Sequence, residues 1–193
     1  MKIPSSKSDS FPFKAIGLIE LSSIAMGFLT ADAMLKAASV EIVLSRTVCP
    51  GKYIVLIWGD VAAVEASVRA GVSVSQGYLV NELVIPNIHP QIFPAITATN
   101  PVKTTDALGV LETFDVVSTI LAADASAKAA NVTLCEIRLA MALGGKAFYS
   151  FTGDVAAVEA AIAAGREVLE SNGLIVNWVV IPRPREELFE EFV

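Results

Sequence analysis

Apolar and polar positions follow two different spacings along the chain, and each spacing predicts a different kind of secondary structure. Short runs rich in Ile, Val and Leu predict β-strands, at residues 14–20, 40–47, 52–58 and 79–85. Apolar side chains at helical spacing predict α-helices, at residues 24–38, 61–72 and, as a short helix, near 90–96. Asp60 is placed to cap the second helix, and a Pro-Gly loop joins the middle pair of strands. The predicted order is β-α-β-β-α-β.

This order occurs twice, because the chain contains an internal repeat. Residues 15–46 and 107–138 share 12 identities in 32 positions at an offset of 92. After a change of two residues in length, residues 59–66 and 153–160 are identical at all eight positions. The changes in length fall between predicted elements, where loops belong. The sequence therefore predicts a tandem duplication.

The duplication sets the predicted domain organisation and fold class. Strands that alternate with helices and include a hairpin are typical of the ferredoxin-like split βαβ unit, an antiparallel four-stranded sheet with helices. We predict an α+β chain with a first domain at 15–101 and a second at 107–193. Residues 1–14 lack the apolar core of a signal peptide, and their Ser, Lys and Pro content predicts a flexible extension.

Composition then narrows the classes of partner. Hydrophobic residues make up 54% of the 193 residues, and the net charge is −6. The longest apolar stretches, 15–38 and 107–130, are interrupted by charged residues, so we predict no membrane span and a soluble, intracellular protein. Nucleic acid is not a predicted partner, because neutralising phosphates needs clustered Lys and Arg. An apolar surplus without a membrane span favours burial against copies of the same chain.

Side chains able to do chemistry are few. Cys49 and Cys135 are too few for a disulfide framework, and no Cys or His cluster has the spacing of a metal site within one chain. Cys135 lies in a predicted strand and is interpreted as a small buried hydrophobe. The only histidine, His89, has no nucleophile or carboxylate at a telling spacing, so we predict a hydrogen-bonded structural role. The equivalent carboxylates Glu20 and Glu112 are interpreted as structural too.

Four repeated segments carry a family resemblance. They are residues 15–20 (Ala-Ile-Gly-Leu-Ile-Glu), 32–40, 59–66 (Gly-Asp-Val-Ala-Ala-Val-Glu-Ala) and 84–86 (Val-Ile-Pro), each with a counterpart in the second half. Together they resemble the bacterial microcompartment (BMC) shell domain. Two fused copies imply the tandem-domain shell class, in which three chains form a pseudohexagonal homotrimer that tiles a shell facet. The resemblance implies a structural protein and not an enzyme, located in the shell of a cytoplasmic organelle beside other shell proteins.

The loop at residues 47–52, Thr-Val-Cys-Pro-Gly-Lys, resembles that of tandem shell proteins that carry an iron–sulfur cluster on the trimer axis. The turns at 87–90 and 181–184 add to this likeness. The resemblance implies one [4Fe-4S] cluster per trimer, held by one Cys49 thiolate from each chain, for electron transfer or cluster exchange across the shell. It also implies a redox partner in the lumen or the cytosol. A free Cys49 beside a metal-free pore is the alternative.

Two further sets of residues follow from the resemblance. The pore loop is predicted to comprise Thr47, Val48, Pro50, Gly51, Met141, Leu143, Gly144 and Gly145. Lys36 and Lys128 end equivalent helices, where a lysine either complements the helix dipole or, as in the family, packs at the edge between tiles. Arg183 resembles the arginine that docks into a neighbouring tile, and Asn87 replaces it in the first copy.

Three functions therefore stay open. The first is a shell tile with an iron–sulfur cluster, and the second is a shell tile whose metal-free central pore passes small metabolites. The third, from another class, is a ligand-binding or enzymatic protein on a duplicated ferredoxin-like scaffold, since that scaffold hosts many activities. This third function would need a pocket with convergent polar groups.

Overall fold

The computed structural model describes residues 15–101, 106–141, 143–170 and 173–190. The chain divides into two compact units, Met1–Ile88 and His89–Val193. The predicted extension at residues 1–14 lies outside the described residues. None of the helices in the described residues is both long and apolar enough to cross a membrane.

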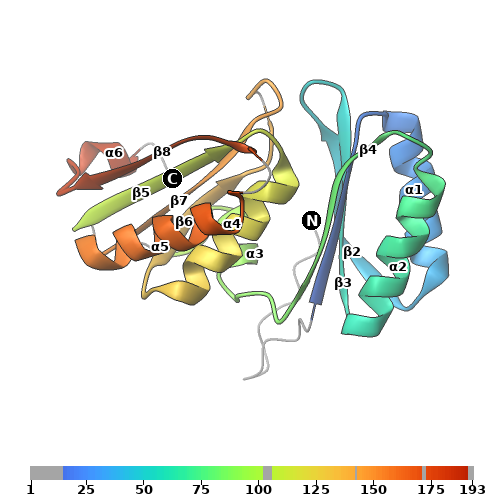
Figure 1. The fold of residues 1–193 in the computed structure, drawn as a ribbon, viewed down its shortest axis with the longest axis horizontal. Helices are drawn as coiled ribbons and strands as arrows, with labels where there is room; N and C mark the ends of the chain where they lie inside the picture. The colour runs from blue at the N-terminus through green and yellow to red at the C-terminus, as the bar shows by residue number, and fades with distance from the viewer. Residues whose placement is uncertain (1–14, 102–105, 142, 171–172, 191–193) are drawn as a thin grey trace. The chain divides into compact units, whose positions relative to one another are not determined.

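The first unit is one antiparallel sheet with two helices packed on the same face (Figure 1). Its elements are β1 (Ala15–Leu21), α1 (Ile24–Ala37), β2 (Val40–Val48), β3 (Lys52–Gly59), α2 (Val61–Val74) and β4 (Leu79–Pro86). The strand order is β2-β3-β1-β4, so β2 and β4 form the edges. The central strand β1 is buried along its whole length, because it lies between two strands and beneath the helices.

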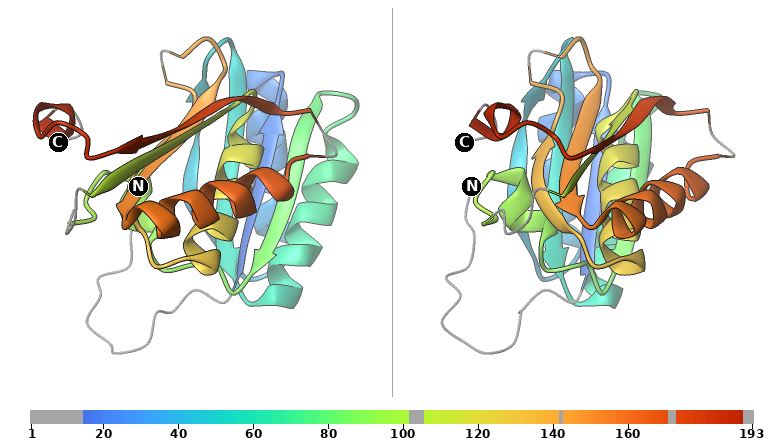
Figure 2. Two further views of the ribbon diagram at one scale, coloured as in Figure 1. Left: turned by 60° about the vertical axis from the view of Figure 1, so that its left-hand side comes forward. Right: turned by 90° about the vertical axis from the view of Figure 1, so that its left-hand side faces the viewer.

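The second unit repeats this arrangement, with α4 and α5 packed on one face of its sheet (Figure 2). Its elements are α3 (Ile92–Ile96), β5 (Ala107–Thr113), α4 (Val116–Ala129), β6 (Thr133–Arg138), β7 (Ala147–Gly153), α5 (Val155–Glu167), β8 (Ile175–Pro182) and α6 (Glu187–Glu190). The strand order is β6-β7-β5-β8. The predicted ferredoxin-like class is therefore confirmed in both units.

The first long helix of each unit begins at a side-chain cap. Ser23 Oγ accepts a hydrogen bond from the backbone N–H of Met26 at 3.4 Å. Asp115, which occupies the equivalent position, accepts one from the N–H of Ser118 at 2.7 Å. Such a cap satisfies an N–H that has no partner within the helix. The start of the helix is thus encoded in both copies, although the capping residue differs.

In the second unit, α5 approaches α4 and β7 closely at Gly165. A Cβ atom there would lie 2.3 Å from Tyr149 Oη and 2.6 Å from Ser126 Oγ. These two hydroxyls are hydrogen-bonded to each other at 2.7 Å, and Ser126 Oγ also donates to the carbonyl oxygen of Ala161 at 2.7 Å. The Tyr149 hydroxyl is therefore the donor to Ser126. Only a glycine leaves room for this buried pair.

The segment that follows β4 covers the edge strand β6. Gln91 Nε2 donates to the carbonyl oxygen of Val132 at 3.0 Å, and Gln91 Oε1 accepts from the N–H of Leu134 at 2.7 Å. Asn100 Nδ2 donates to the carbonyl oxygen of Leu134 at 2.8 Å. The free edge of a strand carries backbone groups without a neighbouring strand. Two side-chain amides take the place of that strand here.

These contacts place the boundary between the packed units earlier than the predicted domain boundary. The first domain was expected to run from 15 to 101. The compact second unit begins at His89, because α3 and the amides around it pack on β6. The boundary of the sequence repeat and the boundary of packing therefore differ by the length of this segment.

Candidate functional site

The Cys49 loop is the tip of the hairpin formed by β2 and β3. Val48 and Lys52 are the last paired residues, and the N–H of Gly51 donates to the carbonyl oxygen of Val48 at 3.1 Å. The peptide bond between Cys49 and Pro50 is cis, and Gly51 has a φ of 84°, a conformation that favours glycine. Cys49 is a free, half-buried thiol beside the exposed Pro50 and Gly51. The hairpin thus presents one thiol at its tip.

The base of this hairpin is anchored to the sheet. The Lys52 ammonium forms an ion pair with Glu20 of β1, whose side chain is fully buried. One position further along β3, the hydroxyls of Tyr53 and Ser45 are hydrogen-bonded at 2.9 Å across the strands. Both contacts fix the strands from which the loop projects. Through this ion pair Glu20 holds the hairpin on the sheet, which is a structural role of the kind predicted for it.

The predicted pore-loop residues differ in their exposure. In the first unit, Thr47, Pro50 and Gly51 are exposed, whereas Val48 is buried. In the second unit, Met141 and Gly144 are exposed, Leu143 is half-buried and Gly145 is buried. The side chain of Val48 therefore supports the loop from inside. Residue 142 lies outside the described residues.

The second unit carries an equivalent but more exposed ion pair at its loop between β6 and β7. Lys146 Nζ lies 2.5 Å from Glu112 Oε1, and the two side chains are 43% and 32% exposed. The N–H of Lys146 also closes the loop by donating to the carbonyl oxygen of Leu143 at 3.2 Å. The same two residue types therefore stand at the base of both loops, in different surroundings.

Cys135 is confirmed as a buried side chain. It lies in β6 where the pairing with β7 shifts register between Leu134 and Glu136, and it is 4% exposed. Burial raises the pKa of its thiol to about 12, and the negative charge of Glu136 acts in the same direction. A thiol with so high a pKa carries almost no thiolate, which is the form that binds metals. Burial inside the sheet thus disfavours the thiolate of Cys135.

The two predicted edge lysines form ion pairs within their own helices. Lys36 Nζ lies 2.6 Å from Asp32 Oδ2 on α1, with both side chains exposed. Lys128 Nζ lies 2.6 Å from Asp124 Oδ2 on α4, where the aspartate side chain is only 6% exposed. Asp124 Oδ1 also accepts a hydrogen bond from the N–H of His89 at 2.8 Å. The two equivalent helices thus end in the same kind of ion pair, but the aspartate is exposed on α1 and buried on α4.

The His89 imidazole is hydrogen-bonded, as predicted, because its Nδ1 accepts from the N–H of Gln91 at 3.4 Å. The surroundings of this imidazole also predict a pH effect. Burial lowers the pKa of His89 from its ordinary 6.5, Lys128 lowers it further, and Asp124 opposes both. The unfolded chain therefore binds a proton at His89 more readily than the folded chain does. The stability contributed by the neutral imidazole is fully present above pH 6.5 and is lost as the pH falls below it. We expect the free energy of unfolding to fall more steeply between about pH 7.5 and 5.5 in the parent than in His89→Gln, measured by urea titration. Equal slopes would contradict this role of His89.

Arg183 lies in the turn after β8, and Asn87 lies in the same turn after β4. Both residues have positive φ, 47° for Arg183 and 53° for Asn87. The N–H of Arg183 donates to the carbonyl oxygen of Asp106 at 2.7 Å, and its side chain is exposed. The turn therefore directs Arg183 outward, and its predicted role between tiles stays a prediction.

A metal site within one chain is not formed by the described residues, among which no three His, Cys, Asp or Glu side chains come together. Cys49 supplies one thiol per chain, so a cluster would need several chains. A half-buried thiol at an exposed hairpin tip suits such a shared site, because the tip can approach its counterparts closely. The donor chemistry fits, since thiolates are the usual ligands of iron–sulfur clusters.

The chain is similar to known proteins over most of its length. The family model described as the BMC domain matches residues 15–88 and again residues 107–184. The chain is 43% identical over 180 residues to the bacterial microcompartment shell protein PduT of Citrobacter freundii, covering 93% of this chain and 98% of that protein. A crystal structure of a microcompartment protein from Desulfitobacterium hafniense DCB is 49% identical, with a TM-score of 0.83, and covers 91% of this chain and 98% of that one. The shell protein EutM of Escherichia coli K12 is 41% identical over 87 residues, covering 45% of this chain and 88% of its own.

Proposed function

From the premise that this chain belongs to the BMC domain family, we propose that three copies form a pseudohexagonal tile with an iron–sulfur cluster on its axis. The chain is a structural protein of a bacterial microcompartment shell, as the resemblance of its sequence predicted. PduT and EutM, to which it is similar, are both named as shell proteins. The proposal adds the number of chains, the cofactor and its task.

The cluster is proposed because Cys49 lies at the tip of an anchored hairpin. A three-fold axis beside this tip would bring three thiolates together, one from each chain. Three cysteine ligands suit a [4Fe-4S] cluster whose fourth iron has another ligand. Such a cluster, when bound, supplies one-electron transfer or is itself exchanged across the shell.

The residues around Cys49 have distinct tasks in this arrangement. The exposed Pro50 and Gly51 carry no bulky polar group, so neighbouring hairpins can approach without burying an unpaired charge. The ion pair between Lys52 and Glu20 holds the strand from which the loop projects. Cys49 is the metal ligand, and the rest of the hairpin positions it.

The proposal is tested by measuring iron and acid-labile sulfide in anaerobically purified protein. We expect about four of each per trimer in the parent chain and none in Cys49→Ser. The trimer should persist in Cys49→Ser, because the loop is small relative to the apolar faces that would join the chains. The oligomeric state is measured by light scattering during size-exclusion chromatography.

Cys135→Ala is the matched control, because it removes the other thiol of the chain and should keep the full iron content. Iron retained in Cys49→Ser would overturn the assignment of the ligand. No iron in the parent, with the trimer intact, would overturn the cluster and leave a tile with a metal-free pore. A parent chain that stays monomeric would overturn the tile itself.

A further inference from the structure

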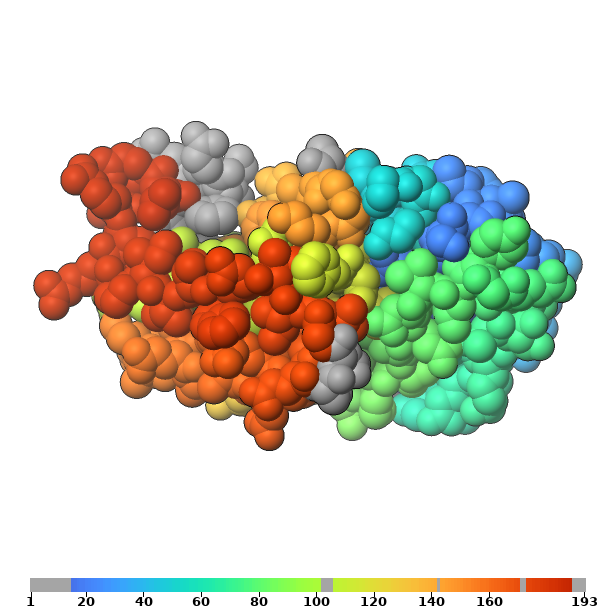
Figure 3. Space-filling view, turned by 45° about the horizontal axis from the view of Figure 1, so that its top comes forward, coloured from blue at the N-terminus to red at the C-terminus, as the bar shows by residue number. Residues whose placement is uncertain are grey.

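The sheet of the first unit carries charged side chains at the base of the Cys49 hairpin, on the face turned away from its helices. This hairpin, coloured cyan, lies at the surface in the space-filling view (Figure 3). Glu20 and Arg46 are both paired with Ile54, one from each side, so the three side chains lie on the same face. Lys52 lies two positions before Ile54 on β3 and shares this face, where it forms its ion pair with Glu20. Two cations and one carboxylate therefore lie behind the loop that holds the thiol.

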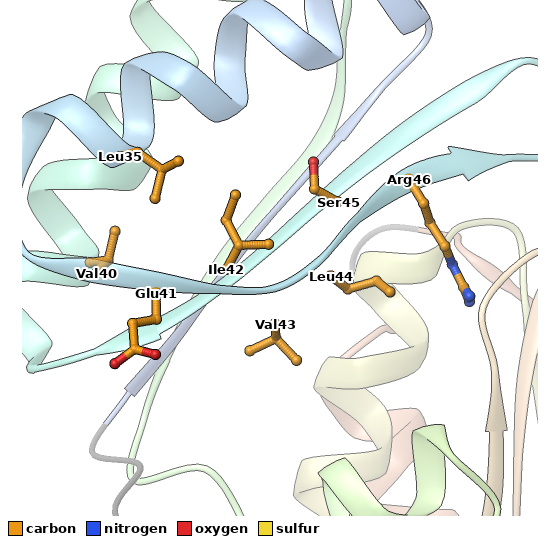
Figure 4. Close-up of a pocket in the computed structure, with 8 residues that line it drawn as sticks. All are labelled: Leu35, Val40, Glu41, Ile42, Val43, Leu44, Ser45 and Arg46. Atoms are coloured by element: carbon orange, nitrogen blue, oxygen red, sulfur yellow. The ribbon is translucent and has the colours of Figure 1, made fainter. Parts of the chain in front are cut away.

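The direction of the Arg46 side chain follows from the alternation along β2. In Figure 4 Ser45 points toward the side of α1, whereas Leu44 and Arg46 point to the opposite side. Arg46 is half-buried, and its Nε atom is buried and has no hydrogen-bond partner among the described residues. Cys49 follows three residues later, about 10 Å along the strand direction. Arg46 therefore places a partly buried positive charge close to the thiol.

The second unit repeats these charged positions with one addition. Arg138 corresponds to Arg46 at an offset of 92, and its Nε atom lies 2.6 Å from Oε2 of Glu136 on the same strand. The residue of the first unit that corresponds to Glu136 is Leu44. The lysine–glutamate pair at the base of the loop is present in both units. These positions therefore carry two cations and two carboxylates in the second unit, but two cations and one carboxylate in the first.

The extra positive charge lies in the unit whose loop holds the thiol. The corresponding loop of the second unit, residues 139–146, has no cysteine in its sequence. A cluster held by three thiolates is negatively charged and becomes more negative when it takes up an electron. A nearby cation therefore stabilises the reduced state more than the oxidised state. Three chains around one axis would supply three such cations, one beside each thiolate.

We propose that Arg46 raises the reduction potential of the cluster at Cys49, because Leu44 stands where the second unit has a neutralising glutamate. The inference deepens the proposed function and rests on its cluster. Arg46 is not a ligand, and it acts on the cluster through its charge alone. In the step that it favours, one electron passes from a reduced one-electron donor to the cluster, and no bond is made or broken.

The test is a redox titration of the anaerobically purified trimer with mediator dyes, followed by the visible absorbance of the cluster. Leu44→Glu gives Arg46 the carboxylate that the second unit already has. It should lower the equilibrium constant for one-electron reduction about tenfold, which is a fall in potential of about 59 mV. Leu44→Gln is the matched control, because glutamine has the size and polarity of glutamate without its charge, and it should leave the potential at the parent value.

A second pair of variants changes the cation itself, and it carries the test if Leu44→Glu fails to fold. Arg46→Gln removes the positive charge and should lower the equilibrium constant for reduction by a similar factor. Arg46→Lys keeps the charge and should keep the parent potential. Iron and acid-labile sulfide are measured in every variant, so that loss of the cluster is distinguished from a change in its potential.

The outcomes separate this inference from the proposed function. A parent potential in Arg46→Gln, with the full iron content, would overturn the role of Arg46 while the cluster stands. Equal shifts in Leu44→Glu and Leu44→Gln would show that packing and not charge moves the potential, and would overturn the inference as well. A parent chain without iron would overturn the cluster itself, and with it the task assigned to Arg46.

Discussion

Replacing Lys52 by methionine is expected to lower the free energy of unfolding by about 3–5 kcal/mol, the usual cost of removing one partner of a buried ion pair. Its partner Glu20 is 0% exposed, and Lys52 itself is 14% exposed. The substitution leaves the Glu20 carboxylate inside the sheet without the nearby cation, and a methionine cannot replace its charge. Urea unfolding at fixed protein concentration, followed by tryptophan fluorescence, measures the loss.

The second repeat supplies a matched control for this prediction. Lys146→Met removes the cation of the equivalent pair with Glu112, but both of these side chains are partly exposed. Water therefore compensates the remaining carboxylate, and we expect a loss below about 1 kcal/mol. The double variant Glu20→Met with Lys52→Met should recover most of the stability, because no charge is then left buried. Equal losses in Lys52→Met and Lys146→Met would contradict the argument from burial.

The second large effect is expected at Gly165. Gly165→Ala should lower the free energy of unfolding by about 2–4 kcal/mol, although alanine is the better helix former by about 1 kcal/mol. The new Cβ would lie 2.3 Å from Tyr149 Oη and 2.6 Å from Ser126 Oγ, so the hydrogen bond between these hydroxyls could not persist. Thermal and urea unfolding of the purified variant measure the change.

Gly71→Ala is the control, because Gly71 occupies the equivalent position in α2. Its new Cβ would meet Ile19 Cδ1 at 2.5 Å and Met34 Cγ at 2.8 Å, both atoms of flexible apolar side chains. These atoms can move without leaving a polar group unpaired, so we expect a smaller loss than at Gly165. A gain in stability in Gly165→Ala would show that helix propensity outweighs the clash and would contradict the prediction.

Much of the fold could be predicted from local patterns. The apolar runs and helical spacings place each element within about two residues of its observed bounds, because a buried strand and an amphipathic helix leave different periodicities. Because the sequence is repeated, each predicted element had a counterpart that supported it. The covering of β6 by Gln91 and Asn100 could not be predicted, because the sequence around an amide in a loop does not indicate which distant backbone group it will bind.

The candidate site was predictable only in part. Cys49 stood out through the motif around it, and the burial of Cys135 followed from its place in a strand. The unequal burial of the two equivalent ion pairs could not be foreseen, since Glu20 and Glu112 occupy the same position of the repeat. The exposure of these side chains depends on what packs around each copy, and the repeated sequence does not indicate this packing.

The covering of β6 by residues 89–100 has a consequence for how assembly depends on concentration. This segment is joined to β4 by the chain itself, so it meets the edge at an effective concentration on the order of millimolar. A free peptide would lose translational freedom on docking, whereas the tethered segment has already lost most of it. Fusion of two domains thus makes one edge contact independent of dilution.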